Sequence, residues 1–290
     1  MNTKKLILPL MLALACGSAS ATVIPFLGAA QQFVVLGAEA VTNVGMTTLH
    51  GDLGIAPGSS ITGTNSIMFA SGGVIHQANA IAMQAQSDAR SSYERLAALT
   101  GGVDLSGQDL GSVTLTSGIY RFSSSAALAG TMTIDFANDP NGVVIVQVGS
   151  TLTTAANSIV NVINGTSSNG IYFQVGSSAT MGADAIFAGN ILAREGVTFG
   201  SASSIACGRA LALGAAVTMI GNAVSNDCNA YAPTSLANDY GSAGYSGNGV
   251  AALPPAEVPE PATLALFGLG ICGVGLLRLR RRSNFAHSHR

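Results

Sequence analysis

Threonine recurs in one local setting along the middle of this sequence. At residues 179–182 and again at 197–200, a small apolar residue, a threonine, a large apolar residue and a glycine follow one another. The threonine side chain carries a hydroxyl group that donates and accepts hydrogen bonds, next to a methyl group. Repeated at regular intervals on a surface, these side chains offer ordered hydrogen bonding rather than a reactive group.

The residue types that usually catalyse reactions or bind metals are sparse. His50 and His76 are the only histidines between residues 22 and 261, and no Cys–His or His-x-x-x-His ligand spacing occurs. No G-x-S-x-G nucleophile motif stands between a strand and a helix. A glycosidase needs two carboxylates that face each other, and the acidic candidates are scattered: Asp135, Asp139, Asp184 and Glu195. We predict a non-enzymatic protein with no cofactor and no metal, with a carbohydrate lyase or hydrolase as the alternative.

Two kinds of segment alternate from Gly118 onward and would position the threonines. Segments such as GVVIVQVGS and GIYFQVGS alternate with segments such as ATMGADAIF and VTFGSASSI. Threonines take comparable places in the second kind, at intervals of about 18 to 27 residues, which is near the period of stacked coils. Because one coil alone leaves its apolar face exposed, we expect the coils to stack into a mainly β solenoid with one continuous core.

Side chains alternate between the two sides of a strand, so the sequence also predicts which residues point outward. If Val197 and Phe199 point into the core, Thr198 points out. Neighbouring strands lie about 4.8 Å apart, and the outward side chains then form a flat rank. The predicted outer face consists of Thr131, Thr133, Thr153, Asn157, Thr180, Thr198, Thr218 and Asn222.

Residues 73–99 follow a different period. Their apolar positions fall at steps of three and four, which is typical of an amphipathic helix, and Gly101 and Gly102 end it. We predict that this helix covers one side of the solenoid with its apolar stripe. The stripe consists of Ile75, Ala78, Ala82, Ala85, Ala89, Tyr93 and Leu96.

Charge is distributed unevenly along the chain. Between residues 22 and 261, five arginines stand against all 14 acidic residues, which gives this part a net charge of about −9. A nucleic-acid backbone needs a basic face on its partner. We therefore exclude nucleic acid as a partner.

Two of the 4 cysteines, Cys207 and Cys228, lie outside the two terminal segments. In an exported protein we expect them to form a disulfide, which would close a loop of about 20 residues and stabilise the fold by roughly 3 kcal/mol. A metal site is the alternative reading. It is weaker because no histidine lies near in sequence and two thiols are too few ligands.

The beginning of the chain reads as a targeting segment. Residues 1–21 place two lysines before a short apolar run and a small-x-small site, which predicts a signal peptide cleaved after Ala21. We expect a folded body over residues 22–231. Residues 232–257 are rich in Gly, Ser, Ala and Pro and predict a flexible linker.

The segment 258–282 resembles the PEP-CTERM sorting signal of Gram-negative bacteria. An apolar run of about 16 residues and a cluster of arginines follow the motif Val258, Pro259, Glu260 and Pro261. The resemblance implies recognition by an exosortase-type membrane transpeptidase and cleavage near the motif. Arginines after an apolar span stay in the cytoplasm. We therefore expect a transmembrane segment at 258–282, a cytoplasmic tail at 283–290 and an exported body, transiently anchored and then secreted or held at the cell surface.

The body, about residues 31–228, resembles the β-solenoid ice-binding proteins of bacteria, fungi and algae. Four segments carry the resemblance: FVVLGAEAVTNVGMTTLHGDLGIAPGSSITG, LTSGIYRFSSSAALAGTMTIDFANDPNGVVIVQVGSTLTTAANSIV, IYFQVGSSATMGADAIFAGNILA and CGRALALGAAVTM. It implies a right-handed β-solenoid of roughly triangular section, with a long helix along it and an N-terminal segment that completes the stack. It also implies adsorption to ice through one flat face, here the eight residues predicted above. Asp184 and Ile220 depart from such a face, because one is charged and the other bulky.

Two hypotheses of function follow, since a fold does not carry function by itself. The first is an exported, monomeric ice-binding protein, an antifreeze or inhibitor of ice recrystallisation, whose partner is the ice surface. The second is a cell-surface or matrix adhesion protein that keeps the fold without ice activity and binds extracellular polysaccharide. A regular threonine rank favours the first hypothesis, and large irregular side chains across it favour the second.

Overall fold

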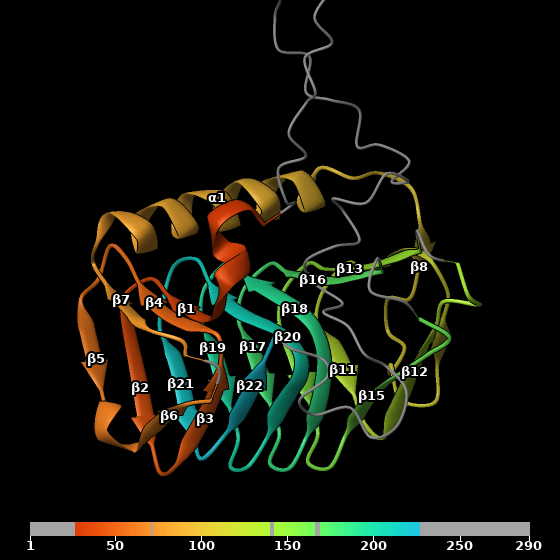
Figure 1. Ribbon diagram of the computed structural model, residues 1–290. Coiled ribbons are helices and arrows are strands. Elements are labelled where there is room, and N and C mark those ends of the chain that lie inside the picture. The colour runs from red at the N-terminus through yellow and green to blue at the C-terminus, as the bar shows by residue number, and fades with distance from the viewer. Residues whose placement is uncertain (1–26, 71, 140–141, 166–168, 227–290) are drawn as a thin grey trace, which may run out of the picture. The chain divides into compact units, whose positions relative to one another are not determined.

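The computed structural model describes residues 27–70, 72–139, 142–165 and 169–226. These residues form a stack of parallel strands wound into coils, with one helix lying along it (Figure 1). The strands belong to one 15-stranded and one 7-stranded sheet. Parallel strands stacked coil upon coil are the architecture of a solenoid, so the mainly β solenoid expected from the sequence is confirmed.

Each complete coil contributes one strand to each of three faces, which we name the helix face, the threonine face and the third face. The helix face contains β8 (Val103–Asp104), β10 (Gly118–Phe122), β13 (Val143–Val148), β16 (Gly170–Val175), the later parts of β18 (Ile186–Ala193) and β20 (Ser204–Ala212), β1 (Phe33–Gly37), β4 (Asp52–Ile55) and β7 (Ile75–Gln77). The threonine face contains β11 (Ala126–Leu128), β14 (Leu152–Thr154), β17 (Ala179–Met181), β19 (Val197–Phe199), β21 (Val217–Ile220), β2 (Ala40–Val44) and β5 (Ser60–Thr62). The third face contains β9 (Thr114–Leu115), β12 (Thr131–Asp135), β15 (Ile159–Ile163), the first parts of β18 and β20, β22 (Ala223–Ser225), β3 (Thr47–His50) and β6 (Ile67–Phe69).

The order of the coils in space differs from their order in the sequence. Strand β1 lies between β20 and β4, since Val35 pairs with both Ala210 and Leu53. The coil of β1, β2 and β3 therefore stacks on the last coil of the described chain, as the resemblance implied for the N-terminal segment. Helix α1 (Ala80–Ala97) then carries the chain along the stack to β8 at the far end (Figure 1).

One continuous apolar core runs through the coils. Strands of the threonine face contribute every second residue to it, so that Val197 and Phe199 are fully buried while Thr198 between them is exposed. The strands β18 and β20 reach round the corner between two faces. They bend at the paired glycines Gly189 and Gly208, and a Cβ atom on Gly208 would lie 1.9 Å from the carbonyl oxygen of Gly189.

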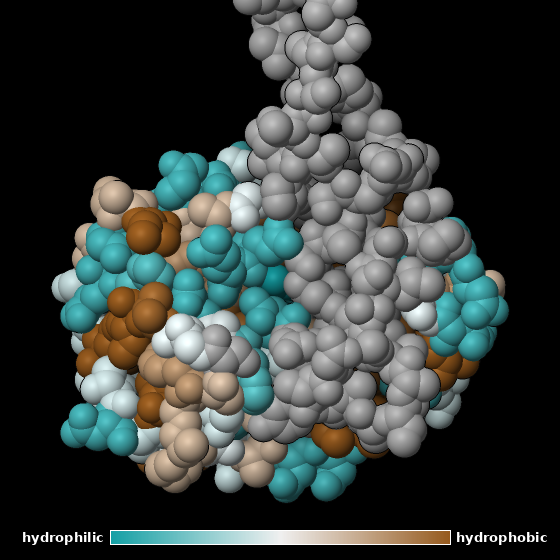
Figure 2. Space-filling view, in the orientation of Figure 1, coloured by the Kyte–Doolittle hydropathy of each residue, from teal (hydrophilic) through white to brown (hydrophobic). Residues whose placement is uncertain are grey.

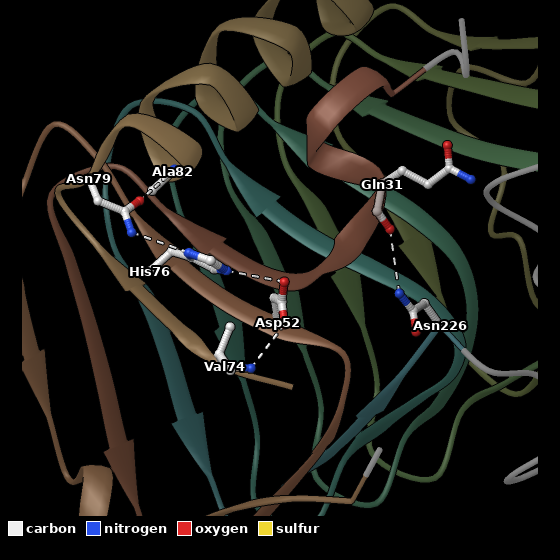
Figure 3. Close-up of polar contacts among 7 residues, drawn as sticks. All are labelled: Gln31, Asp52, Val74, His76, Asn79, Ala82 and Asn226. Atoms are coloured by element: carbon white, nitrogen blue, oxygen red, sulfur yellow. Dashed lines mark hydrogen bonds and ion pairs between the residues drawn. The ribbon is translucent and has the colours of Figure 1, made fainter. Parts of the chain in front are cut away.

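The helix begins later than residues 73–99 predicted. Residues 75–77 instead pair as β7 with β4 and give the backbone groups at that edge their hydrogen-bond partners. Ala78 then adopts a left-handed backbone with φ 48°. The Asn79 side chain accepts a hydrogen bond from the backbone nitrogen of Ala82 at 2.9 Å and caps the helix (Figure 3).

The apolar stripe of α1 is confirmed at Ala82, Ala85, Ala89 and Leu96, all of which are fully buried. Two polar residues, Gln86 and Ser92, share the buried side. The side-chain nitrogen of Gln86 donates to the carbonyl oxygens of Gly37 and Ala212 at 2.9 and 3.0 Å. The helix thereby bonds to an early and a late coil at once.

The short helix η1 (Gly28–Gln32) holds the beginning of the described chain against the late coils. Arg209 is only 1% exposed, and its Nε donates to the carbonyl oxygen of Gln31 at 2.8 Å. Its Nη1 donates to Oδ1 of Asn190 at 3.0 Å. Asn226 also donates to the Gln31 carbonyl, at 3.4 Å (Figure 3). A second short helix, η2 (Thr64–Ser66), joins β5 to β6.

The surface of the described part is mixed in polarity. Figure 2 shows hydrophobic residues in separate patches among hydrophilic and neutral ones, as is usual for a protein surface exposed to water. Within the described ranges no helix has both the length and the apolar character needed to cross a bilayer. The predicted signal peptide, linker, sorting segment and tail, at residues 1–21, 232–257, 258–282 and 283–290, lie outside these ranges.

Candidate functional site

A column of six threonines runs across the threonine face, one on each of six neighbouring strands. The register pairs Thr153 with Thr180, Thr180 with Thr198, and Thr198 with Thr218. It continues from Thr218 to Thr42 and from Thr42 to Thr62. Ala127 of β11 extends the column at the other end, where it pairs with Thr153. Because parallel strands lie about 4.8 Å apart, the hydroxyl groups repeat at that interval.

The core holds the column in place. Thr180, Thr198 and Thr218 each stand between two inward residues of the apolar cluster. Val217 and Met219, on either side of Thr218, are both fully buried. The threonines themselves are exposed or half-buried. Threonine is branched at Cβ, which restricts its side chain to few rotamers on a strand. The positions of the hydroxyl and methyl groups are therefore restricted before a binding partner arrives.

Small side chains flank the column on both sides. On one side, Thr151 donates through its hydroxyl to that of Ser125 at 2.8 Å, and Ser178 continues this row. On the other side lie Gly182 and Gly200, which have no side chain to protrude from the surface. No residue within the seven strands of this face is charged. The surface is therefore flat and uncharged over most of its extent.

Two bulky residues interrupt the flat surface at one corner. Ile220 pairs with Val44 in register, and these side chains are 40% and 58% exposed. The sequence identified Ile220 as a departure from a flat face, and the structure places it two residues beyond Thr218 at the end of β21. Asp184 lies off the face, in the turn between β17 and β18.

Thr131 and Thr133 do not belong to the threonine column. Both lie on β12 of the third face, where Thr131 pairs with Ile159 and Thr133 pairs with Thr114 and Asn161. Their prediction as members of one face was wrong because strand alternation gives the outward direction without giving the face. The third-face column is irregular in size and runs Thr131, Ile159, Ile186, Ser204, Ala223, Thr48 and Met68.

Asn157 also lies off the threonine face, at a corner of its coil. It has a left-handed backbone with φ 58°, and the equivalent corners hold Asp184 and Ala202, both with φ 56°. Asparagine and aspartate tolerate this conformation better than most residues. The turn at the corner of the coil therefore explains why an asparagine stands at position 157.

Asn222 is only 3% exposed, so its predicted place on the outer face was wrong as well. Its side-chain nitrogen donates to the carbonyl oxygens of Gly200 and Ser203 at 2.8 and 2.9 Å. Its backbone nitrogen donates to the Thr47 hydroxyl at 3.1 Å. The side chain bonds one coil to the next inside the corner.

Sequence reasoning missed Thr42 and Thr62, which complete the column. The signal was present, because Val41 precedes Thr42 as Val197 precedes Thr198, and Ile61 precedes Thr62 in the same way. The coils were counted only from Gly118 onward. The N-terminal strands β2 and β5 join this sheet through the pairing of β2 with β21.

His76 and Asp135 are titratable groups that hold local structure. His76 Nε2 lies 3.2 Å from Oδ2 of Asp52, and its Nδ1 lies 3.2 Å from the side-chain nitrogen of Asn79 (Figure 3). Hydrogen bonds from the side chain of Asn164 and the backbone of Ala137 lower the pKa of Asp135. In the described ranges no group of three or more His, Cys, Asp or Glu residues is placed to bind a metal.

Comparison with known proteins identifies the fold and its family. The sequence profile of the family described as "Ice-binding-like" matches residues 35–225, which is well over half of the chain. The chain belongs to this ice-binding-like family. It is 47% identical over 210 residues to an ice-binding protein of Nostoc sp. (strain HG1), an alignment that covers 72% of this chain and 77% of the relative.

Solved structures of the ice-binding-like fold agree. An ice-binding protein of the Antarctic ascomycete Antarctomyces psychrotrophicus superposes with a TM-score of 0.65 at 35% identity, over 69% of this chain and 96% of that one. An ice-binding protein from an Antarctic biological consortium also gives 0.65, at 40% identity, over 69% and 90%.

A second profile, the PEP-CTERM protein-sorting motif, matches residues 257–282. This match confirms the resemblance of the segment that contains Val258, Pro259, Glu260 and Pro261. The chain thus combines an ice-binding-like body with a sorting motif that is associated with export.

The predicted partner of Cys207 lies outside the described residues. Cys207 is 5% exposed and belongs to β20, which pairs with β22, the last strand of the described chain. The bond to Cys228 stays a prediction.

Proposed function

We propose that this protein binds ice through the threonine face. The observation that carries the proposal is the column of six threonines in register on six neighbouring strands. The names of the relatives support it, since the Nostoc protein and both solved structures are ice-binding proteins. No step of bond making is required, and the proposed activity is non-enzymatic.

The physical basis is a preordered surface. Hydroxyl groups at intervals of about 4.8 Å can hold water molecules in a repeating array, and the adjacent methyl groups keep other water out. Fixing the side chains beforehand lowers the entropy cost of adsorption. Charged groups would hold water in their own hydration shells, and the seven strands of this face carry none.

The test is a substitution at the centre of the column. Replacing Thr198 by Tyr adds a large ring to the flat surface while leaving Val197 and Phe199 in the core. We expect thermal hysteresis and inhibition of ice recrystallisation to fall by about tenfold or more, because a lattice contact tolerates little protrusion. Thr131→Tyr is the matched control, since it places the same ring on the third face and should keep full activity.

Equal activity of the Thr198→Tyr and wild-type proteins would refute the choice of face. A folded wild-type protein without any ice activity would refute the function itself. In that case adhesion to a surface or to an extracellular matrix, the competing hypothesis, would be favoured.

We further propose that the protein is exported as a monomer through its two terminal segments. The sorting motif supports cleavage near Val258–Pro261 by an exosortase-type enzyme, with transient anchoring through the apolar run that follows. Residues 1–21 fit a signal peptide. The mass of the protein recovered from outside the cells tests this proposal. An intact chain that retains both terminal segments there would contradict it.

A further inference from the structure

The outward column of the helix face changes character along the stack. It runs in register through Asp104, Arg121, Gln147, Gln174, Leu192, Leu211, Leu36, Gly54 and His76. The leucines are fully buried and suit a face that is covered. Four polar residues occupy the end of the column where α1 finishes, and simple packing of a helix does not require them.

These four polar residues line an open hollow of about 500 Å³. Tyr93 and Ala97 of α1 line it on one side, and Arg194 lies on its wall after β18. A volume in this range accommodates a small organic molecule or a single sugar unit. The hollow lies on the helix face and is separate from the threonine face.

Two polar groups in the hollow, the amide of Gln174 and the Nε of Arg121, have no hydrogen-bond partner among the described residues. Gln174 is only 7% exposed, yet its side chain makes no hydrogen bond among the described residues, unlike the neighbouring Gln147, which donates to the Leu96 carbonyl at 2.5 Å. Arg121 donates through Nη2 to the Leu99 carbonyl, and its Nε is buried without a partner. The amide of Gln174 and the guanidinium of Arg121, which both line the hollow, are therefore available to an occupant.

The charges in the hollow select the occupant. Arg121 and Arg194 are two of the five arginines in a body with a net charge of about −9. Their planar guanidinium groups match a carboxylate. Asp104 at the rim keeps its negative charge, because hydrogen bonds from Ser106 lower its pKa. The two arginines and Asp104 together carry a net charge of about +1, which one carboxylate on the occupant would balance.

The uncharged groups suit hydroxyl-bearing ligands. The amide of Gln174 both donates and accepts hydrogen bonds, as does the phenol of Tyr93. The ring of Tyr93 also offers an apolar surface to the C–H side of a sugar. One carboxylate combined with several hydroxyl groups on one ring is the chemistry of a uronate.

We propose that this hollow binds a uronate unit of an acidic polysaccharide. The arginines hold the carboxylate, and Gln174 and Tyr93 bond to the ring hydroxyls. The rest of the acidic body repels such a chain, so contact is confined to the hollow. This site is independent of ice binding, and one molecule carries both surfaces.

Calorimetric titration of the purified protein tests the proposal with three probes, namely D-glucuronate, D-glucose and inorganic phosphate. We expect saturable binding of glucuronate, at least tenfold tighter than that of glucose or phosphate. Binding of phosphate as tight as that of glucuronate would overturn the sugar assignment. The absence of saturable glucuronate binding would overturn the site.

Two variants locate the binding. Arg194→Gln changes an exposed side chain with no hydrogen bond to the described residues, so the fold should stay intact, and glucuronate binding should weaken about tenfold. Gln174→Leu removes the buried amide and should weaken it similarly at an unchanged melting temperature. Thr198→Tyr should bind glucuronate like the wild type. Unchanged binding in both Arg194→Gln and Gln174→Leu would overturn the proposal.

Discussion

Two asparagines at the corners of the coils serve opposite purposes. Asn222 is buried and bonds to carbonyl oxygens of the preceding coil, whereas Asn157 is exposed and occupies a left-handed turn position. The sequence presents both as small polar residues a few positions after a threonine. Burial distinguishes them, and burial at a corner depends on the neighbouring coil.

Substitution of these two asparagines should give contrasting stabilities. Asn222→Ala removes the donor to the Ser203 carbonyl, while the Gly200 carbonyl still accepts from the Ser203 hydroxyl. The variant should lower the free energy of unfolding by about 1 to 3 kcal/mol. Asn157→Gly keeps the left-handed turn accessible and should change it by less than about 1 kcal/mol. Denaturant unfolding followed by circular dichroism measures both. Equal losses would mean that the Asn222 bonds do not stabilise the corner.

At the scale of elements, local pattern predicted strands better than it predicted their faces. Alternation placed Thr153, Thr180, Thr198 and Thr218 correctly outward, because Val, Leu and Phe neighbours fix the inward side. For Thr131 it gave the outward direction but the wrong face. Strands β11 and β12 of the same coil both have outward positions at every second residue, and alternation does not show which strand belongs to the threonine face. Only the pairing of β11 with β14 shows which strand belongs to the threonine face.

The helix shows the same division between local and distant causes. Its apolar stripe was predictable from spacing alone, but its start depended on β7 pairing with β4, which lies one coil earlier. The polar hollow beside its end was not predicted either. Arg121, Gln147 and Gln174 come from three separate strands, and nothing in the linear sequence shows that they are neighbours.

Packing of α1 on the solenoid should dominate the contribution of the helix to stability. Leu96 is fully buried, so Leu96→Ala should lower the free energy of unfolding by about 2 to 5 kcal/mol through lost burial and a cavity. Met83 on the same helix is 58% exposed, and Met83→Ala should cost no more than about 0.5 kcal/mol. Thermal unfolding compares the two variants. A large loss for Met83→Ala would indicate that a surface outside the described contacts covers the helix.

At the scale of the whole molecule, the predicted disulfide would secure the last coil. If Cys207 bonds to Cys228, reduction should lower the free energy of unfolding by roughly 3 kcal/mol. Cys228→Ser should melt like the reduced wild-type protein and should not respond to reductant. Thiol titration of the unfolded, unreduced protein provides the check. Reactive thiols there from Cys207 and Cys228 would disprove the bond.

The insertion of the first coil between later ones has a consequence for the timing of folding. Val35 must find Ala210, and the backbone nitrogen of Asn222 must find the hydroxyl of Thr47, across most of the described chain. Such distant pairings slow folding, because the entropy of closing a long loop is lost before the stabilising contacts form. While the chain emerges from the ribosome or crosses a membrane, β1, β2 and β3 wait without one of their two neighbours until residues 204–225 arrive. The first coil can therefore complete its pairing only after nearly all of the described chain has emerged.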